Sequence, residues 1–297
     1  MTRPRRFLMI LVAAVLILIW GTTWGAIRVG LRGIPPFTGV ALRFSLASLI
    51  LLAVAWGSGI PLGRARHERM LWVINALLTF SSSYGIVYWC EQYVPSGLTA
   101  ILFSIFPLFV AVLAHFFLPG ERIDGMALAG ILLGCAGTAL IFSEDLARLG
   151  GPMTALASGV MLLSPLVSAV ANIAVKRWGK GIHPLSLAAV PMGMTGLIMG
   201  GVALLTERDL PISFDGASLG ALLYLALFGS ALAFTLYFWL LSHASATQVS
   251  LIVYLLPLIA VAVGILFLHE RLTLPILGGS ALVLCGVAMA VHAHAAP

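Results

Sequence analysis

Charged residues are scarce in this chain, and their scarcity excludes most classes of soluble protein. Lys and Arg number 16 and Asp and Glu 10 among 297 residues, so 9% of the chain is charged, against 61% hydrophobic residues. The mean hydropathy is +1.10, which is too high for a water-soluble domain of this size. Only short stretches separate the apolar runs. We therefore expect a membrane protein without a soluble domain.

The motifs of common enzymes and cofactor sites are also missing. The sequence contains no GxSxG nucleophile motif, no HExxH zinc motif and no Walker A loop. Its three cysteines, Cys90, Cys135 and Cys285, lie in apolar runs without metal-ligand spacing. We expect buried thiols, no metal, no cofactor and no enzymatic activity. Nucleic acid is not an expected partner, because the net charge of +6 forms no basic stripe.

What the chain does contain is a series of long apolar runs. A helix needs about 20 apolar residues to cross a bilayer. Ten runs qualify, over residues 7–27, 37–56, 70–90, 96–118, 124–142, 152–175, 184–205, 217–240, 246–268 and 273–292. Because these runs do not alternate between apolar and polar residues, they favour helices over barrel strands. The expected fold class is an all-α membrane protein with ten transmembrane helices.

The basic residues predict the orientation of these helices. If the N-terminus is cytoplasmic, ten Lys and Arg side chains lie inside and five outside, and Arg43 falls within a span. This asymmetry favours cytoplasmic N- and C-termini. The expected location is a bacterial-type inner (plasma) membrane, crossed many times. The lipid bilayer is then the one evident partner besides a small molecule, and no obligate protein partner is evident.

The chain also repeats itself at an offset of about 149 residues. Matched features include Trp89 with Trp239, Pro107 with Pro257, and Gly130 with Gly279. Each copy has five spans, an odd number, so the second copy must enter the membrane in the opposite orientation. We expect a first five-helix repeat over residues 1–145, a connector over 146–153, and an inverted repeat over 154–297.

Several of these features together resemble a known family. They are the ten paired spans, the segment Trp20-Gly21-Thr22-Thr23-Trp24, Leu42-Arg43-Phe44, and a pattern of Pro, Glu-Arg and Gly in each half. The chain resembles the EamA-type branch of the drug/metabolite transporter superfamily, and most of all the bacterial exporters of aromatic and hydrophobic amino acids. The resemblance implies that spans 5 and 10 are peripheral and that spans 1, 3, 4, 6, 8 and 9 form a cavity.

The expected function is that of a secondary transporter, and export is the expected direction. It would carry small organic metabolites, most of all aromatic or hydrophobic amino acids, by alternating access through a central cavity. An exporter of drugs or other neutral metabolites is the alternative within transport. A membrane sensor or scaffold without transport activity is the alternative from a different class.

Polar and aromatic residues that share helical faces are the candidate substrate contacts. Ser164, Ser168 and Asn172 form one stripe on the sixth span, because residues four apart are helical neighbours. The repeat places Trp20 and Trp24 of the first span at the positions equivalent to Ser168 and Asn172. One copy would offer hydrogen bonds and the other aromatic surface. Helix–helix packing is the competing interpretation for Ser and Asn.

Further candidates lie on the third and eighth spans. Asn75 and Ser82 share a helical face of the third span, and Tyr84 and Tyr88 follow toward its end. Phe234 is the candidate on the eighth span. Aromatic rings bind planar or apolar solutes by stacking, although they also form belts at membrane interfaces.

The fourth and ninth spans carry a matched set. Ser250, Tyr254 and Pro257 of the ninth span correspond to Ala100, Ser104 and Pro107 of the fourth. We expect Ser104, Ser250 and Tyr254 at the cavity. An interior proline removes one helical hydrogen bond, so Pro107 and Pro257 are expected to bend their helices, although proline is common in membrane helices in general.

Ionisable side chains inside the spans are few. Arg43 lies in the outer third of the second span and Glu91 at the outer end of the third. Arg43 could pair with Glu91, bind backbone carbonyls or attract a substrate carboxylate, and a structural role is favoured. No carboxylate stands at the middle of a span, so obligatory proton coupling through such a group is not expected. Glu121 and Glu270 are expected to cap the helices that follow them.

Overall fold

The computed structural model describes residues 3–63, 65–141, 143, 151–259 and 273–293, and all the regular elements in these ranges are helices. Eight of the described helical segments are long and apolar enough to cross a membrane: Arg5–Gly30, Pro36–Gly57, Arg66–Cys90, Leu98–Phe117, Pro152–Trp178, Pro184–Thr206, Gly216–Leu241 and Leu274–Val291. Gly125–Ile141 and Ala246–Ile259 are shorter apolar helices. The protein is therefore an all-helical, multi-pass membrane protein.

The helices begin and end close to the expected boundaries. The described elements are α1 (Arg3–Gly30), α2 (Pro36–Gly57), α3 (Arg66–Ile74), η1 (Asn75–Ser83), α4 (Tyr84–Cys90), α5 (Ser96–Phe103), α6 (Phe106–Phe117), α7 (Gly125–Ile141), α9 (Pro152–Met161), α10 (Leu163–Trp178), α11 (Pro184–Thr206), α12 (Gly216–Ala226), η2 (Leu227–Leu232), α13 (Ala233–Leu241), α14 (Ala246–Ser250) and α16 (Leu274–Ala293). Residues 146–150 of the expected connector and 260–268 of the expected ninth span lie outside the described residues.

Several of the spans consist of more than one helical element. The third contains the π-helical segment η1 between α3 and α4, and the eighth contains η2 between α12 and α13. The fourth is divided into α5 and α6, and the sixth into α9 and α10. Pro107 and Pro165 each lie within the first turns after a division. Such interruptions change which residues share a face, since π-helical turns hold more residues than α-helical ones.

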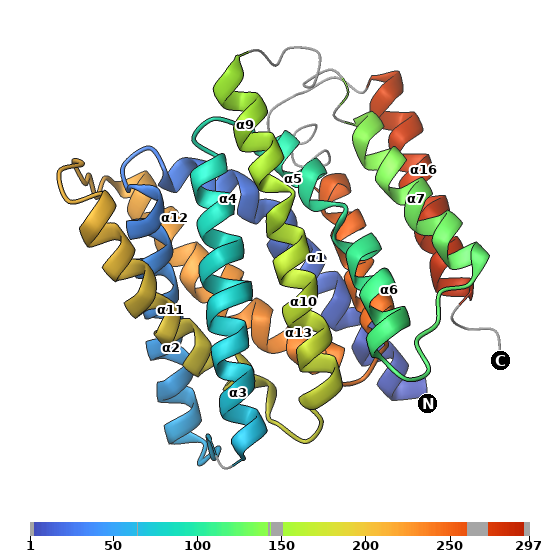
Figure 1. Ribbon diagram of the computed structural model, residues 1–297, viewed down its shortest axis with the longest axis horizontal. Helices are drawn as coiled ribbons and strands as arrows, with labels where there is room; N and C mark the ends of the chain where they lie inside the picture. The colour runs from blue at the N-terminus through green and yellow to red at the C-terminus, as the bar shows by residue number, and fades with distance from the viewer. Residues whose placement is uncertain (1–2, 64, 142, 144–150, 260–272, 294–297) are drawn as a thin grey trace.

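The helices pack as an elongated bundle whose peripheral pair is α7 and α16 (Figure 1). These two helices lie at one edge of the bundle and run antiparallel. Backbone contact replaces side-chain packing between them: a Cβ at Gly130 would lie 2.5 Å from the Gly286 carbonyl oxygen, and one at Gly137 would lie 2.7 Å from that of Gly279. Small residues permit this close approach. α2 packs along α11 at the opposite side of the bundle.

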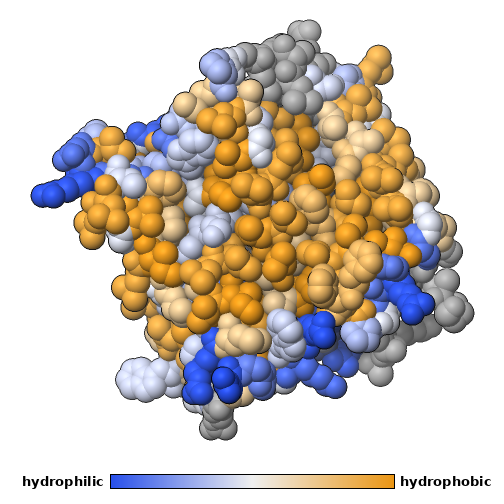
Figure 2. Space-filling view, in the orientation of Figure 1, coloured by the Kyte–Doolittle hydropathy of each residue, from blue (hydrophilic) through white to orange (hydrophobic). Residues whose placement is uncertain are grey.

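The outer surface matches a lipid environment. Figure 2 shows a broad hydrophobic band across the bundle, with hydrophilic residues gathered along its lower edge and at the upper left. Large apolar side chains are exposed on this surface, including Phe116 at 74%, Leu197 at 81% and Leu205 at 87%. In water such continuous apolar exposure is unfavourable. It is expected where the helices face hydrocarbon.

The two ends of the bundle are distinguished by the course of the chain. We call the end where α1 ends, α2 begins and α4 ends the distal end, at the top of Figure 1, and the end where α1 begins the proximal end. At the distal end the Glu207 carboxylate accepts hydrogen bonds from the backbone N–H groups of Phe37 and Thr38, at 2.8 and 2.7 Å. It thereby caps α2, a helix far from it in sequence.

A similar cap lies at the proximal end and corrects one expectation. The Glu121 carboxylate accepts hydrogen bonds from the N–H groups of Ala246 and Thr247, at the start of α14. It does not cap α7, the helix that follows it. Asp124 does so, since its Oδ1 accepts from the Ala127 N–H at 2.6 Å. Glu270, the counterpart of Glu121, lies outside the described residues.

Candidate substrate cavity

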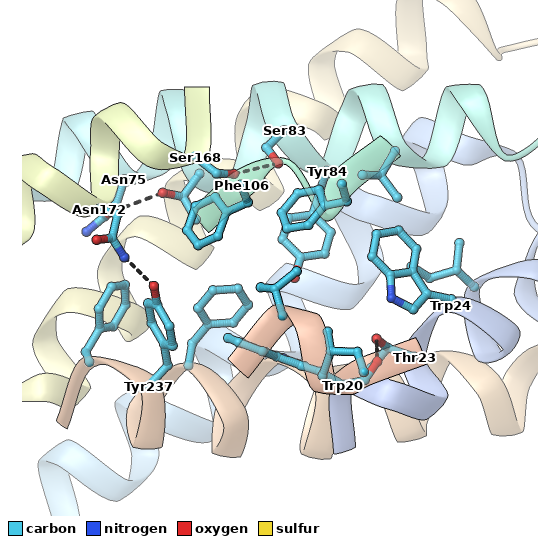
Figure 3. A pocket seen from close by; sticks show the side chains of 18 residues that line it. Trp20, Thr23, Trp24, Asn75, Ser83, Tyr84, Phe106, Ser168, Asn172 and Tyr237 are labelled. Atoms are coloured by element: carbon cyan, nitrogen blue, oxygen red, sulfur yellow. Dashed lines mark hydrogen bonds between the residues drawn. The ribbon is translucent and has the colours of Figure 1, made fainter. Parts of the chain in front are cut away.

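A cavity runs along the bundle between helices that are distant in sequence. Its empty volume, including space open to solvent, is about 820 Å³. The lining residues are Trp20, Thr23, Trp24 and Ile27 of α1; Asn75, Thr79, Ser83, Tyr84 and Val87 of the third span; Phe103 and Phe106 at the α5–α6 division; Ser168 and Asn172 of α10; Phe234, Tyr237 and Phe238 of α13; and Val253 and Leu256 of the helix Ala246–Ile259. Figure 3 shows Asn172 and Tyr237 near one end and Trp24 near the other.

Three buried polar atoms of the lining residues have no hydrogen-bond partner. They are the indole Nε1 of Trp24, the amide Nδ2 of Asn75 and the amide Oδ1 of Asn172. The other amide atoms are used: Asn75 Oδ1 accepts from Thr79 Oγ1 at 3.2 Å, and Asn172 Nδ2 donates to the Tyr237 hydroxyl. Buried polar groups are usually paired, because leaving them unpaired costs free energy. Two free donors and one free acceptor therefore belong to residues that line the cavity, those of Asn75 and Asn172 near one end and that of Trp24 near the other (Figure 3).

Aromatic rings form much of the remaining wall. The ring of Trp20 lies 5.3 Å from that of Phe234 and 5.2 Å from that of Tyr237, centre to centre. Trp24 lies 5.7 Å from Phe103. These separations are typical of favourable aromatic pairs. The rings thus support one another and present apolar surface to the cavity.

The cavity is also electrically neutral as far as the structure describes it. None of the lining residues is Asp, Glu, Lys, Arg or His. A ligand with net charge would lose its hydration without gaining an opposite charge, which is unfavourable. A neutral or zwitterionic ligand avoids this cost.

Hydroxyl groups fix one wall of the cavity. The Oγ atoms of Ser83 and Ser164 lie 2.8 Å apart, and Ser168 Oγ donates to Ser83 Oγ at 2.8 Å. Ser164 is fully buried behind the cavity wall, whereas Ser168 and Ser83 line it. The expected stripe of the sixth span is therefore present, but only Ser168 and Asn172 reach the cavity. Ser164 instead links α10 to η1 through its hydrogen bonds with Ser83.

The π-helical segment corrects the expectation for Ser82. With α-helical spacing, Ser82 shares a face with Asn75. In the structure Ser82 is exposed on the outside, while Ser83 and Tyr84 line the cavity with Asn75 and Thr79. The reason is that the wider turns of η1 rotate the later residues backwards around the helix axis. Ser83, which lacked a place among the expected contacts, takes the position expected of Ser82.

Three more expected contacts lie elsewhere. Tyr254 is fully buried and points toward α7, where its hydroxyl donates to the Ile131 carbonyl oxygen at 2.9 Å. Ser104 and Ser250 donate to carbonyl groups of their own helical turns, at 2.6 and 2.7 Å. None of the three lines the cavity. All three side chains are buried against protein, where their hydroxyl groups are hydrogen-bonded.

Tyr88 belongs to a separate cluster around Arg43. The Arg43 side chain is fully buried. It donates to Ser230 Oγ at 2.7 Å, to the Gly229 carbonyl oxygen at 3.2 Å and to the Tyr88 hydroxyl at 3.3 Å. Of the alternatives considered for Arg43, the structure shows binding to a backbone carbonyl. Arg43 joins α2 to η2, and Tyr88 lies beside it outside the cavity.

The two prolines stand in equivalent places next to the cavity. Having no N–H, Pro107 cannot donate to the carbonyl group of Phe103, and Pro257 cannot donate to that of Val253. Phe103 and Val253 both line the cavity. The chain leaves its helical path at Ser104 and Ile105 before Pro107, and at Leu251 before Pro257. A bend role for both prolines fits this arrangement.

Several lining residues were not among the expected contacts, although Thr79 and Ser83 share the predicted face of Asn75, and Tyr237 and Phe238 accompany Phe234 on the eighth span. Tyr237 is the most important of them, because it holds the Asn172 amide. Its spacing of three residues from Phe234 was a usable signal, since such neighbours share a helical face. Thr79 shared the face of Asn75 in the same way. No local signal distinguished Ile27, Val87 or Leu256 from lipid-facing residues of the same kind.

Comparison with known proteins places this geometry in a family. The model of the EamA-like transporter family matches residues 7–143 and again residues 156–292. The chain belongs to the EamA-like transporter family. Its two matched segments together cover most of the sequence, and both contain residues that line the cavity.

Individual relatives agree with this assignment. The uncharacterized transporter YoaV of Bacillus subtilis is 28% identical, over 92% of each chain. Protein PagO of Salmonella typhimurium is 30% identical, over 82% of this chain and 80% of its own length. A solved crystal structure superposes with a TM-score of 0.82 at 19% identity, over 96% of both chains, which shows the same fold. This EamA protein is thus a membrane transporter.

Proposed function

We propose that this EamA transporter exports small neutral or zwitterionic metabolites with an apolar part, above all aromatic and hydrophobic amino acids. The observation that carries this proposal is the set of unpaired polar atoms among aromatic rings in an uncharged cavity. The Asn75 N–H group would donate to a carboxylate, and Asn172 Oδ1 would accept from an ammonium group. The rings would bury the apolar side chain.

The duplicated sequence supports a mechanism for the same proposal. We infer two inverted five-helix repeats, residues 1–145 and 154–297, that together give ten spans. The two matches of one family model and the π-helical segments in the third and eighth spans support this inference. Helices of one repeat would move against the other around the cavity, with Pro107 and Pro257 as hinges. Export as the direction rests on the resemblance to amino acid exporters.

Purified protein in liposomes tests this proposal. The probes are labelled L-phenylalanine, L-tryptophan and L-leucine, together with L-lysine and L-glutamate as charged amino acids of similar size. We expect protein-dependent flux of the first three and little of the charged pair, because the cavity offers no opposite charge. Flux of the charged amino acids at the same rate contradicts the proposed specificity.

The uncharged cavity also admits a second candidate, an exporter of neutral drugs or other neutral metabolites. A neutral planar dye without amino acid groups discriminates the two. Flux of the dye with none of the five amino acids supports the second candidate. If no compound in this panel moves, the result favours a sensor role in place of transport.

A further inference from the structure

A buried carboxyl group without a partner lies at the distal end of the bundle. Glu91 directly follows the membrane span Arg66–Cys90. Its side chain has an exposed fraction of 0%, and neither of its carboxyl oxygens has a hydrogen-bond partner. Two unpaired acceptor atoms on one buried group are unusual in a folded protein.

Glu91 stands directly beyond the cavity. Val87 lines the cavity, and Glu91 lies one helical turn after it along the chain. The Glu91 N–H donates to the Val87 carbonyl oxygen at 2.9 Å. On α1, Ile27 lines the cavity and Arg28 is the next residue. Glu91 and Arg28 therefore each follow, along their own helix, a residue that lines the cavity.

The neighbouring basic residues do not neutralise this carboxyl group by hydrogen bonding. Arg28 donates to the backbone carbonyl oxygen of Glu91, not to its side chain. Arg43 donates to Ser230, Gly229 and Tyr88. Both guanidinium groups are near enough for their charges to act on Glu91.

Few other ionisable groups surround Glu91. Tyr88 and Cys90 lie beside it on α4, and the Cys90 thiol donates to the Ala157 carbonyl oxygen at 3.2 Å. α2, η1, α9 and α10 pack against α4. In α2 the one ionisable side chain is Arg43, and η1 and α9 carry no ionisable side chain. The ionisable side chains of α10 lie in its last turn, at the proximal end.

Burial decides the protonation of Glu91 in this arrangement. It holds the pKa of the Glu91 carboxyl group well above its usual range, and the charges of Arg28 and Arg43 offset this effect only in part. An ionised carboxylate in this place would lack both water and a hydrogen-bond donor. The raised pKa favours the neutral, protonated form of this carboxyl group in the folded protein.

We propose that Glu91 is a proton-binding site that gates the distal end of the cavity. With the proton bound, the neutral carboxyl group stays buried and this end stays closed. When this end opens, water solvates the group, its O–H bond breaks and the proton passes to water. Closing reverses the step, since a proton from water forms the O–H bond again. That this end admits or releases the substrate rests on the function proposed above.

The location of Glu91 explains why the sequence predicted no such site. A coupling carboxylate would be sought at the middle of a span, and because the sequence has none there, no proton coupling was predicted. Glu91 lies at the end of a span, where contact with water is the ordinary expectation. Its burial comes from the packing of α2 and α9 around α4.

Infrared spectroscopy of the full chain in detergent tests the proton site without transport. The wild type should show a protonated-carboxyl C=O band at neutral pH that is missing in Glu91→Gln and shifted in Glu91→Asp. Asp209→Asn removes an exposed carboxylate at the same end and should keep the band. If wild type and Glu91→Gln have identical carboxyl bands at neutral pH, the proposal is overturned.

A transport assay in liposomes tests the gate with L-phenylalanine as the probe. Exchange of labelled for unlabelled L-phenylalanine is measured at equal pH on both sides of the membrane, over a pH series. We expect the exchange rate to rise with pH for wild type and Asp209→Asn, because loss of the proton favours the open distal end. Glu91→Gln cannot lose a proton, so its exchange rate should not follow this pH dependence.

The two assays separate the two proposals. The same pH dependence of exchange in Glu91→Gln as in wild type overturns the gate. If wild type exchanges no L-phenylalanine while the infrared band depends on Glu91, the proton site is supported and the proposed amino acid function is wrong.

Discussion

Asn172 shows how one side chain serves both the structure and the cavity. Its amide nitrogen donates to the Tyr237 hydroxyl and so fixes the orientation of the amide group. Its carbonyl oxygen is then left facing the cavity without a partner. An acceptor held in place in this way loses little entropy on binding a ligand, which is the advantage of a preformed site.

Asn172→Ala should weaken substrate binding without loss of the fold. One net hydrogen bond is worth about 1 kcal/mol, which corresponds to a KM for L-phenylalanine raised by roughly fivefold. Initial rates of flux in proteoliposomes measure this change. Ser82→Ala is the matched control, because Ser82 is exposed outside the cavity. Equal KM values for the two variants would contradict the role given to Asn172.

Glu91 makes a residue-scale prediction about stability as well. Its pKa is raised in the folded protein, so the folded state holds a proton that the unfolded state releases above its ordinary pKa of about 4.3. Stability should therefore fall as pH rises from that value toward the folded pKa, by about 1.4 kcal/mol per pH unit.

Glu91→Gln removes this dependence, because its amide does not titrate. Thermal unfolding in detergent over a pH series should show the variant gaining stability over wild type with rising pH. Asp209→Asn should follow wild type throughout. Parallel curves for wild type and Glu91→Gln would show that burial does not perturb Glu91.

At the scale of single helices, the interruptions determine which residues meet the cavity. η1 turns Ser83 inward and Ser82 outward, and the division before α6 brings Phe103 and Phe106 to the same wall. The positions of the spans were predictable from hydropathy, because the length of an apolar run is set by the bilayer. The π-helical segments were not, because spacing arguments assume regular α-helical turns.

The antiparallel pair of α7 and α16 should be sensitive to any added side-chain atom. Gly130→Ala would place a Cβ 2.5 Å from the Gly286 carbonyl oxygen and 2.8 Å from the Ala290 nitrogen. Such overpacking costs about 1–3 kcal/mol. We expect a lower thermal unfolding temperature in detergent.

Gly159→Ala provides the control for this pair. Gly159 lies in α9, and a Cβ there meets nothing within 4 Å. Since alanine favours the helix more than glycine does, this variant should be as stable as wild type or slightly more so. If the two variants unfold at the same temperature, α7 and α16 do not pack as closely as described.

Over the whole molecule, contacts between the two halves of the chain occur at both ends. Glu207 caps α2 at the distal end, and Glu121 caps α14 at the proximal end. Arg43 crosses between the halves beside the cavity. A transporter that opens alternately must break such contacts at one end while keeping them at the other. The residues that make such contacts lie far apart in the sequence, so no local sequence pattern predicts the contacts.

The distribution of Lys and Arg predicts that the distal end faces away from the cytoplasm. A fluorescent protein fused to the C-terminus should fluoresce, while alkaline phosphatase at the same place should be inactive. Phosphatase inserted between Arg208 and Asp215, at the distal end, should be active. The reverse pattern would show that the protein has the opposite orientation in the membrane, and it would contradict the proposed direction of export.

The sequence by itself determined the membrane class, the positions of the apolar helices, the repeated halves and the family. Each of these depends on composition, run length or chain spacing, which the bilayer and the chain constrain directly. It also indicated Trp20, Trp24, Asn75, Tyr84, Ser168, Asn172 and Phe234, all of which the structure places at the cavity.

Only the tertiary structure decided which polar groups remain without partners. Tyr254 and Ser164 resemble cavity residues by spacing, yet neighbouring helices satisfy their hydrogen bonds. Asn172 and Glu91 lie in equally apolar stretches, yet each keeps buried atoms unpaired. The physical reason is that burial and hydrogen bonding depend on what packs opposite a residue, and this is set by segments distant in the sequence.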